Sequence, residues 1–423
     1  MRLNLHASLL VGILGYAAML PSGKACAQTV GGLLPPRPDG GIDIHHINTG
    51  EGAAAYFILP DGTTLLVDCG DGGDIKRPPQ YKAPRLPDES RPPAEWVARY
   101  IEKFRPAGAA ALDYLVISHF HSDHMGGVPG LASRMPIRKI LDRGWPDYGK
   151  PSAFTGEFAD RYKAALKDQI ERHHAVVERF KPGVNDQIVL RKEPAKHPGF
   201  EVRQIMANAE VWTGQGTQAR SRFPANDEPN ENACSTGFRL RLGSFDYYTG
   251  GDIPGVLTGE VSLKTPLSAG RGPVKEWRDM ESPVAWVTGP VDVAVLNHHG
   301  GSDTTNAFFL SVLQPRVMLA QTWATPQVSP AVLQRLLSES IYPGPRDIFT
   351  TNGLWPGRRE HLIATYGEDA ALRHIAGLEK LTATQGHLVV RVAPGGATYH
   401  MIVLEDSQES FRIRSVHGPY ESR

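Results

Sequence analysis

The chain has 423 residues, enough for one large domain or two ordinary ones with a substantial buried core. Its 45 Lys and Arg residues balance its 45 Asp and Glu residues. The first 27 residues hold Arg2 and Lys24 and no acid, so their removal leaves a net charge of −2. This balance excludes a strongly basic surface, and we expect neither a long nucleic acid nor an anionic membrane as partner.

Residues 1–27 have the pattern of a cleavable secretory signal peptide. Arg2 supplies the positive charge, Leu9–Leu20 is apolar, and Ala25-Cys26-Ala27 offers small residues before a cut at Gln28. The alternatives are a short membrane anchor and a lipoprotein signal that uses Cys26. An anchor is disfavoured because the apolar stretch is shorter than the ~20 residues that span a bilayer. We therefore predict a periplasmic or secreted protein without a membrane span.

After a Gly- and Pro-rich extended lead-in at 28–41, apolar patterning predicts strands and helices along one domain at 42–423. The predicted strands span 42–47, 55–59, 63–67, 112–117, 200–206, 237–242, 245–248, 291–296, 316–321, 347–351, 387–392 and 397–404. The predicted helices span 94–104, 154–180, 304–313 and 330–339, with a loop-rich insertion at 255–283. This order predicts two sheets sandwiched between helices, and residues 326–423 complete the sandwich because their strands need a sheet to join.

The segment from Ser118 to Gly127 is the strongest chemical signal in the sequence. Four ligand-type side chains, His119, His121, Asp123 and His124, fall within six residues directly after a predicted buried strand. Residues two apart in extended chain point the same way, so His119 and His121 can grip one metal ion together. Asp123 and His124 follow a turn and can reach a second ion. A polar loop with incidental histidines does not account for this density.

One loop cannot complete two coordination shells, and further ligand types do follow other predicted strands. Asp252 ends the strand-Gly-Gly-Asp segment and is placed to bridge both ions, because each carboxylate oxygen can hold one metal. His298 and His299 follow the strand at 291–296. One of this pair suffices as ligand, and we prefer His298; the other can donate a proton or pack. Residues 321–324 also follow a strand and can line the cleft, although ordinary loop polarity is the favoured explanation.

In order and spacing these motifs, with Leu66-Val67-Asp68-Cys69-Gly70 before them, resemble the metallo-β-lactamase superfamily over residues 42–325. Within it the chain looks most like the hydrolase domain of bacterial DNA-internalisation competence proteins. The segments that carry this likeness are Gly50–Ala55, Asn230–Ser235 and His298–Ser302. The resemblance implies an α/β fold, a four-layer αββα sandwich with two metals at one edge of the sheets. It also implies that Asp68 orients the site from behind the ligands; a strand-end turn residue is the alternative.

One departure from the family pattern concerns the ligands. Many family members carry another histidine about 20 residues before the bridging aspartate, where this chain has Asn230-Glu231-Asn232. Glu231, Asn232 and Ser302 are therefore candidates for a contact to the metal or to its ligands. We expect two divalent ions, Zn²⁺ in the first place, with Mn²⁺ favoured if oxygen ligands replace the missing imidazole.

The expected function is that of an exported dinuclear hydrolase that uses a metal-activated hydroxide. Asp123 would orient the nucleophile, and one of His298 and His299 would protonate the leaving group. The likeness to competence proteins favours a phosphodiester or phosphate ester, presented as a small molecule or a short chain. A lactone or other cyclic ester is the second possibility, and a non-catalytic metal-binding surface module is the third.

Two cysteines remain after the expected cleavage, Cys69 and Cys234. They lie in motifs that should converge at one end of the fold, so a disulfide is possible in an oxidising compartment. The alternative, two buried free thiols, is slightly favoured.

Overall fold

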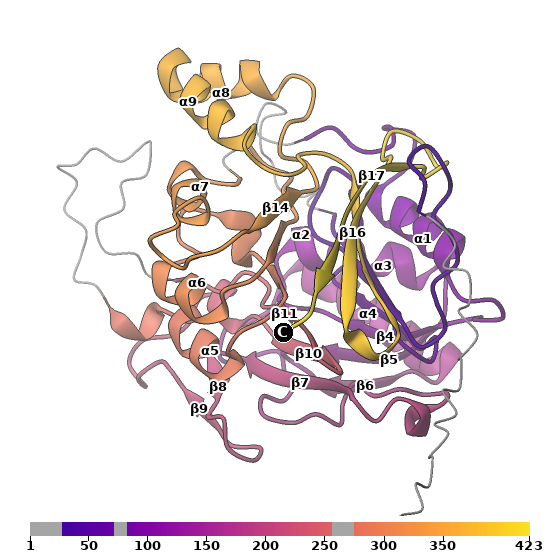
Figure 1. Ribbon diagram of the computed structural model, residues 1–423. Helices are drawn as coiled ribbons and strands as arrows, with labels where there is room; N and C mark the ends of the chain where they lie inside the picture. Colours follow the sequence, from indigo (N-terminus) through magenta and orange to yellow (C-terminus); the bar gives the residue numbers. More distant parts are fainter. Residues whose placement is uncertain (1–27, 72–82, 256–274, 326) are drawn as a thin grey trace, which may run out of the picture.

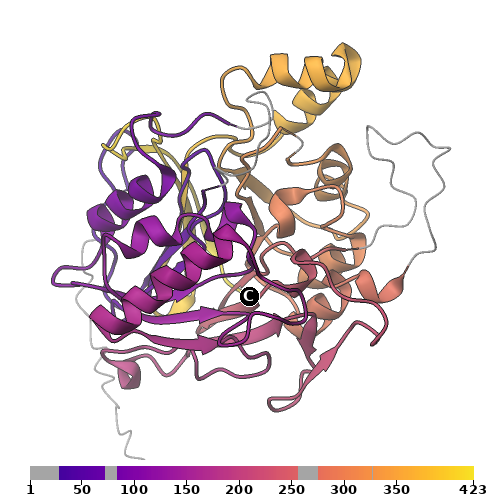
Figure 2. The same cartoon turned by 180° about the vertical axis from the view of Figure 1, so that it is seen from behind.

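The computed structural model describes residues 28–71, 83–255 and 275–423 with the exception of 326 (Figure 1). The expected signal peptide and most of the expected insertion at 255–283 lie outside these residues. Two large sheets pack face to face, and helices cover their outer faces (Figures 1 and 2). The predicted α/β sandwich is confirmed, since this arrangement is consistent with the metallo-β-lactamase fold.

The first sheet has nine strands and joins the two ends of the described chain. In spatial order these are β17 (Ile413–Glu421), β16 (Thr398–Leu404), β15 (His387–Val392), β1 (Ile42–His46), β2 (Ala55–Ile58), β3 (Thr64–Val67), β4 (Leu112–Val116), β5 (Ile137–Asp142) and β6 (Val176–Arg179). β15 pairs antiparallel with β1 over five residues. The strands β3 to β6 run parallel. Residues 387–421 therefore supply three of the nine strands of the same sheet that the N-terminal strands begin.

The second sheet has eight strands. Their order is β14 (Asp347–Thr350), β13 (Val317–Ala320), β12 (Val293–Val295), β11 (Phe245–Thr249), β10 (Gly237–Leu242), β7 (Phe200–Ala207), β8 (Glu210–Trp212) and β9 (Ala219–Ser221). β11 to β14 run parallel, so their carboxyl ends lie at one edge. Buried apolar side chains from both sheets form the core between them, with Phe57, Phe238 and Tyr247 at its centre.

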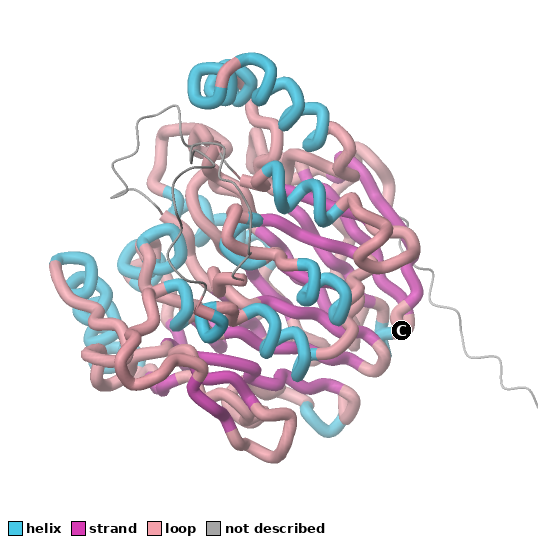
Figure 3. Tube along the Cα trace, turned by 90° about the vertical axis from the view of Figure 1, so that its left-hand side faces the viewer, coloured by secondary structure: helices cyan, strands magenta, loops and turns pink. Residues whose placement is uncertain are grey.

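Helices complete the outer layers (Figure 3). Residues of α1 (Pro93–Phe104), α3 (Val128–Ala132) and α4 (Glu157–His173) pack on the nine-stranded sheet. Residues of α5 (Glu281–Thr288), α6 (Ala307–Leu313), α7 (Pro330–Leu336) and α9 (Glu368–Leu378) pack on the eight-stranded sheet, and α8 (Arg358–Tyr366) contacts α9. Within the described residues, no helix combines the length and the apolar character that crossing a membrane requires.

Three local differences from the sequence prediction have physical causes. The helix predicted over 154–180 ends at His173, because His174 adopts a left-handed backbone with φ 55° and the chain turns into β6. The short helix α5 was missed because its Val, Thr and Trp residues give no clear helical periodicity. The helices α8 and α9 and the strand β17 were also absent from the prediction; α8 and β17 have only two buried residues each, so apolar patterning marks them weakly.

Candidate metal centre

The predicted ligand segments meet at one edge of the two sheets. Ser118 follows β4 of the first sheet, Gly251 follows β11 of the second, and His298 follows β12. Backbone hydrogen bonds tie these segments: Thr236 N donates to Ser118 O at 2.7 Å, and His298 N donates to Gly251 O at 3.1 Å. Carboxyl ends of parallel strands from both sheets thus deliver their side chains to one place.

His119, His121 and Asp252 form the first group of ligand-type side chains, with ligand atoms within 4.8 Å of one another. His119 Nε2 lies 3.1 Å from His121 Nδ1 and 3.7 Å from Asp252 Oδ2. His119 and Asp252 are buried, whereas His121 is exposed. This group therefore opens to solvent on the His121 side.

Asp123, His124, Asp252 and His299 form the second group, and all four are buried. His124 Nε2 lies 3.2 Å from Asp252 Oδ1 and 3.3 Å from His299 Nε2. His299 Nε2 lies 3.2 Å from Asp123 Oδ2. Asp252 belongs to both groups. This is the bridging position that we predicted for it from its place after a strand.

Hydrogen bonds on the side away from the cluster fix the two histidines of the second group. Asp68 accepts a hydrogen bond from His124 Nδ1 at 2.8 Å, and it also accepts from the Ser118 backbone N–H and hydroxyl, each at 2.7 Å. His299 Nδ1 donates to the Gln321 carbonyl at 2.8 Å. These bonds engage the Nδ1 atoms and leave both Nε2 atoms facing the cluster. Asp68 has the contacts that the family resemblance implies.

Gly126 and Gly127 allow the chain to pass close behind the ligands. A Cβ atom on Gly126 would lie 2.3 Å from Asp71 O, and one on Gly127 would lie 2.3 Å from Cys69 O. Both glycines have ordinary negative φ values. The sequence therefore needs glycine here for close backbone approach rather than for a left-handed turn.

The donor set suits two cations. Asp123 and Asp252 are buried carboxylates, and their only ion-pair partners among the described residues are histidines. Two pairs of imidazole nitrogens also face each other, His119 with His121 and His124 with His299. Facing lone pairs beside two buried carboxylates need positive charge between them, and imidazole with carboxylate is a common ligand set for Zn²⁺ and Mn²⁺.

The charges of the cluster lower the pKa values of Asp123 and His119 and raise that of His124. Burial raises the pKa of the Asp123 carboxyl, but His124 and His299 together outweigh burial and the net shift is downward. Burial and the adjacent His124 hold the pKa of His119 well below its ordinary value. Burial lowers the pKa of His124, but the surrounding carboxylates outweigh burial and hold it well above its ordinary value. The two downward shifts favour deprotonated ligands, whereas a metal ion at His124 has to displace a proton.

Other candidate residues lie outside the two groups. His298 is one-third exposed, its Nδ1 lies 2.8 Å from Asp303 Oδ1, and its Nε2 stays 3.8 Å from Asp252. The structure thus places His299 among the ligand atoms, in contrast to the sequence preference for His298. The reason is backbone conformation: both residues have positive φ, 48° and 55°, which turns His299 inward.

The segment after Asn230 does not supply a replacement imidazole. The Glu231 carboxylate accepts from Phe120 N at 2.7 Å and pairs with the buried Arg143. Asn232 is half-buried on a 3-10 turn, and Ser302 is exposed. Cys69 and Cys234 are both buried free thiols, the alternative that the sequence slightly favoured.

A buried acid behind the His298–His299 turn was not found from the sequence. Glu281 of α5 accepts hydrogen bonds from Asn297 Nδ2 at 2.8 Å, Thr305 N at 2.6 Å and Asn306 N at 2.8 Å. It thereby fastens both ends of the loop that carries His299. Burial raises the pKa of Glu281 to about 8. A glutamate in an unrecognised helix gives no sequence signal for this role.

Comparison with known proteins agrees with this geometry. Residues 48–204 match the sequence profile described as the metallo-beta-lactamase superfamily. The match includes the histidine motif at 119–124, whereas Asp252 and His299 lie beyond it and join the centre through the fold. No curated protein matches the chain.

Solved structures give distant likenesses only. CmlA, a diiron β-hydroxylase from Streptomyces venezuelae, is 13% identical with a TM-score of 0.36, covering 85% of this chain and 55% of its own. Zn²⁺-bound PqqB from Methylobacterium extorquens is 10% identical with a TM-score of 0.33, covering 66% and 88%. Yeast PDE1 is 10% identical with a TM-score of 0.34, covering 82% and 99%. At these scores the likeness supports no inference about the activity of this chain.

Proposed function

We propose that this chain is an exported dinuclear metal-dependent hydrolase that acts on a phosphodiester or phosphate ester. The observation that carries the proposal is the pair of ligand groups, His119/His121/Asp252 and Asp123/His124/Asp252/His299, which share the Asp252 carboxylate. Two ions that share a carboxylate are the arrangement that suits hydrolysis of an ester or phosphoester.

Each residue has a distinct part in holding the ions. His119 and His121 would hold one ion, and Asp123, His124 and His299 the other, with one oxygen of Asp252 for each. Zn²⁺ is the first expectation for both places because imidazoles outnumber carboxylates in the donor set, and Mn²⁺ is the alternative. Bound ions would lower the pKa of a water between them and polarise the oxygen of the substrate that is attacked.

The protein side chains would orient the reactants and move the proton. Asp123 presents its carboxylate beside His299, at 3.2 Å, and can accept a hydrogen bond from the attacking water. His298 stands at the solvent side of the cluster, with its Nδ1 held by Asp303 and its Nε2 3.8 Å from Asp252. We assign proton delivery to the leaving group to His298 Nε2.

The substrate class rests on the resemblance of three sequence segments to competence-protein hydrolase domains. A phosphate ester also suits a pair of cations, because its negative charge is drawn to them. The overall charge balance of 45 basic and 45 acidic residues supports a small molecule or short chain rather than a long nucleic acid.

The test combines metal analysis with a substrate panel on the protein without its first 27 residues. We expect two ions per chain and turnover of bis-p-nitrophenyl phosphate above that of a lactone panel. His121→Ala should abolish turnover, whereas His173→Ala, which removes an exposed histidine of α4, should leave it unchanged. Two bound ions without turnover of any ester would support the non-catalytic module instead, and lactone turnover alone would overturn the substrate class.

Export is tested separately. Expression of the full sequence in a bacterium with a secretory pathway should yield protein outside the cytoplasm whose N-terminus is Gln28. Recovery of the intact N-terminus from the cytoplasm would contradict this part of the proposal.

A further inference from the structure

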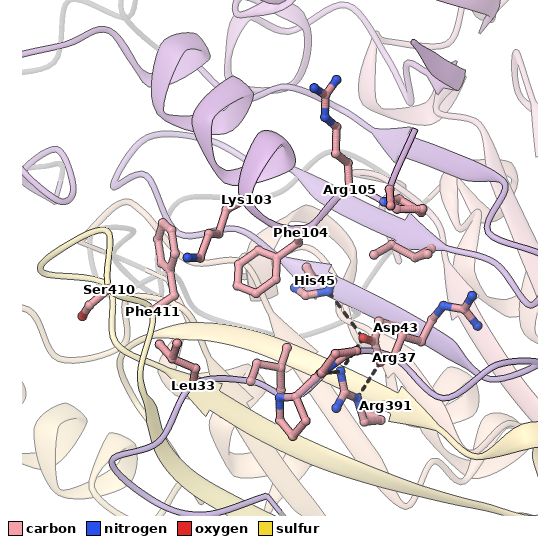
Figure 4. Close-up of a pocket in the computed structure, with 16 residues that line it drawn as sticks. Leu33, Arg37, Asp43, His45, Lys103, Phe104, Arg105, Arg391, Ser410 and Phe411 are labelled. Atoms are coloured by element: carbon pink, nitrogen blue, oxygen red, sulfur yellow. Dashed lines mark hydrogen bonds and ion pairs between the residues drawn. The ribbon is translucent and has the colours of Figure 1, made fainter. Parts of the chain in front are cut away.

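A second cavity lies away from the metal centre, on the outer face of the nine-stranded sheet near the start of β1 (Figure 4). Its volume is about 470 Å³, within the range of small-molecule sites. Six segments line it: the lead-in at 33–37, β1, Ile58 of β2, residues 103–107 at the end of α1, Arg391 of β15, and Ser410–Phe411. It shares no lining residue with the small cavity beside the metal ligands.

The wall formed by the lead-in is fixed to the body of the protein. Gly31 N donates to Ile413 O at 2.8 Å, and Ile413 N donates to Gly32 O at 2.9 Å. Arg37 Nη1 donates to Gly41 O at 2.6 Å. Because backbone bonds hold this wall on β17 and beside β1, the cavity is a formed feature rather than a gap beside a loose chain end.

One side of the cavity is apolar and aromatic. The Phe104 ring lies 4.8 Å from the His45 ring and 5.6 Å from the Phe411 ring. Leu33 adds an apolar side chain that is 57% exposed. These side chains offer van der Waals contact to an apolar group that enters from solvent.

The other side carries more positive than negative charge. Asp43 is already neutralised by Arg391, which donates to it at 2.9 and 2.7 Å, and Arg105 pairs with Glu102 at 2.6 Å. Arg37 lies on this side and Lys103 lies beside the aromatic rings, and among the described residues neither has a carboxylate within ion-pair distance. Burial lowers the pKa of Arg37, and the nearby carboxylates of Asp43, Asp39 and Asp61 offset only part of that shift.

Lys103 and His45 supply donors where the charged and apolar sides meet. Figure 4 shows Lys103 between the Phe411 and Phe104 rings, with His45 beyond Phe104. Tyr100 can donate its hydroxyl proton only to His45 Nδ1, 3.0 Å away, among the described residues. The remaining proton of the neutral imidazole is then on Nε2, which is buried, lies 3.9 Å from Asp43 Oδ2 and has no hydrogen-bond partner among the described residues.

We propose that this cavity binds a small organic carboxylate attached to an apolar body, independently of the metal centre. The carboxylate would face Lys103 and the cationic side, and the apolar body would contact Phe104, Phe411 and Leu33. A phosphate would bring a second charge and a third oxygen against apolar walls, so it fits this lining less well.

The test is calorimetric binding of benzoate, indole-3-acetate and octanoate to the metal-loaded protein, beside their neutral amides and inorganic phosphate. We expect one of the carboxylates to bind at least roughly tenfold tighter than its amide and tighter than phosphate. Lys103→Met should weaken its binding roughly fivefold or more, because one charge-assisted contact is lost. Lys380→Met, an exposed lysine on the far helical layer, should leave it unchanged.

A second pair of variants tests the apolar wall without disturbing the core. Leu33→Asp places a negative charge in the wall and should abolish carboxylate binding, whereas Val30→Asp, in the same lead-in and 63% exposed, should not. His121→Ala should also retain binding, which separates this cavity from the metal centre. Equal binding by wild type and Lys103→Met, preference for phosphate, or no binding by any carboxylate would overturn the proposal.

Discussion

The two ligand groups of the metal centre differ in how firmly the protein holds them. In the group with His124 and His299, every side chain is buried and both imidazoles are fixed from behind, by Asp68 and by the Gln321 carbonyl. In the group with His119 and His121, His121 is exposed. Two sites with similar ligand types can therefore bind metal ions with different affinity. The hydrogen bonds that fix the ligands and the access of solvent affect metal affinity as much as ligand type does.

The largest effect should come from the residue that both groups share. Asp252→Asn replaces one of the two carboxylate oxygens by an amide nitrogen and removes the negative charge that both groups share, so we expect loss of both ions. Activity should fall on the order of 10³-fold or more, because electrostatic stabilisation of the reaction depends on both ions. Metal analysis and kinetics of the purified variant check this. Retention of two ions would show that Asp252 is not the bridge.

Single-histidine variants should separate the two groups. His299→Ala removes a ligand from the buried group. His121→Ala removes the exposed ligand of the other group. We expect each to retain one ion, and titration with a chelator should remove the remaining ion more readily from His299→Ala. That order follows because the ion left in His299→Ala sits in the exposed group. Easier removal of the remaining ion from His121→Ala would show that the buried group does not hold its ion more firmly.

Asp68→Asn tests the support behind the buried group. It keeps the shape of the side chain and removes the charge that His124 faces at 2.8 Å. We expect metal affinity in that group to fall about 10–100-fold, the usual cost of losing such a partner. The matched control is Asp88→Asn, at an exposed loop carboxylate remote from the ligands. An unchanged affinity would mean that Asp68 is only a turn residue.

The last expected effect concerns stability rather than metal binding, at the contacts of Glu281. Its folded-state pKa of about 8 lies above its ordinary value of 4.5, so the folded protein binds the proton more tightly than the unfolded chain. Stability from this group is therefore full below pH 4.5 and decreases as pH rises towards 8. The slope can approach about 1.4 kcal/mol per pH unit.

Denaturant unfolding of wild type and Glu281→Gln between pH 6 and 8 measures this effect. We expect the difference in unfolding free energy between the two proteins to change with pH in the stated direction, since the amide does not titrate. A difference that is constant with pH would contradict the raised pKa of Glu281.

The sequence alone predicted the sandwich and the residues of the centre because their signals are local. The strand before His119, the spacing of His119, His121, Asp123 and His124, and the strand ends at Asp252 and His299 are all visible as short patterns. Alternation of apolar residues marks buried strands, and ligand types at strand ends mark a shared edge.

Only the tertiary structure decided which neighbours face one another. The choice between His298 and His299 depends on two positive φ values that no residue type at those positions announces. The ion pair of Glu231 with Arg143 joins residues 88 positions apart. Glu281 bonds to residues 16 to 25 positions away, and the cavity at the start of β1 is lined by residues more than 300 positions apart. Such contacts arise from the packing of whole layers, so local composition cannot specify them.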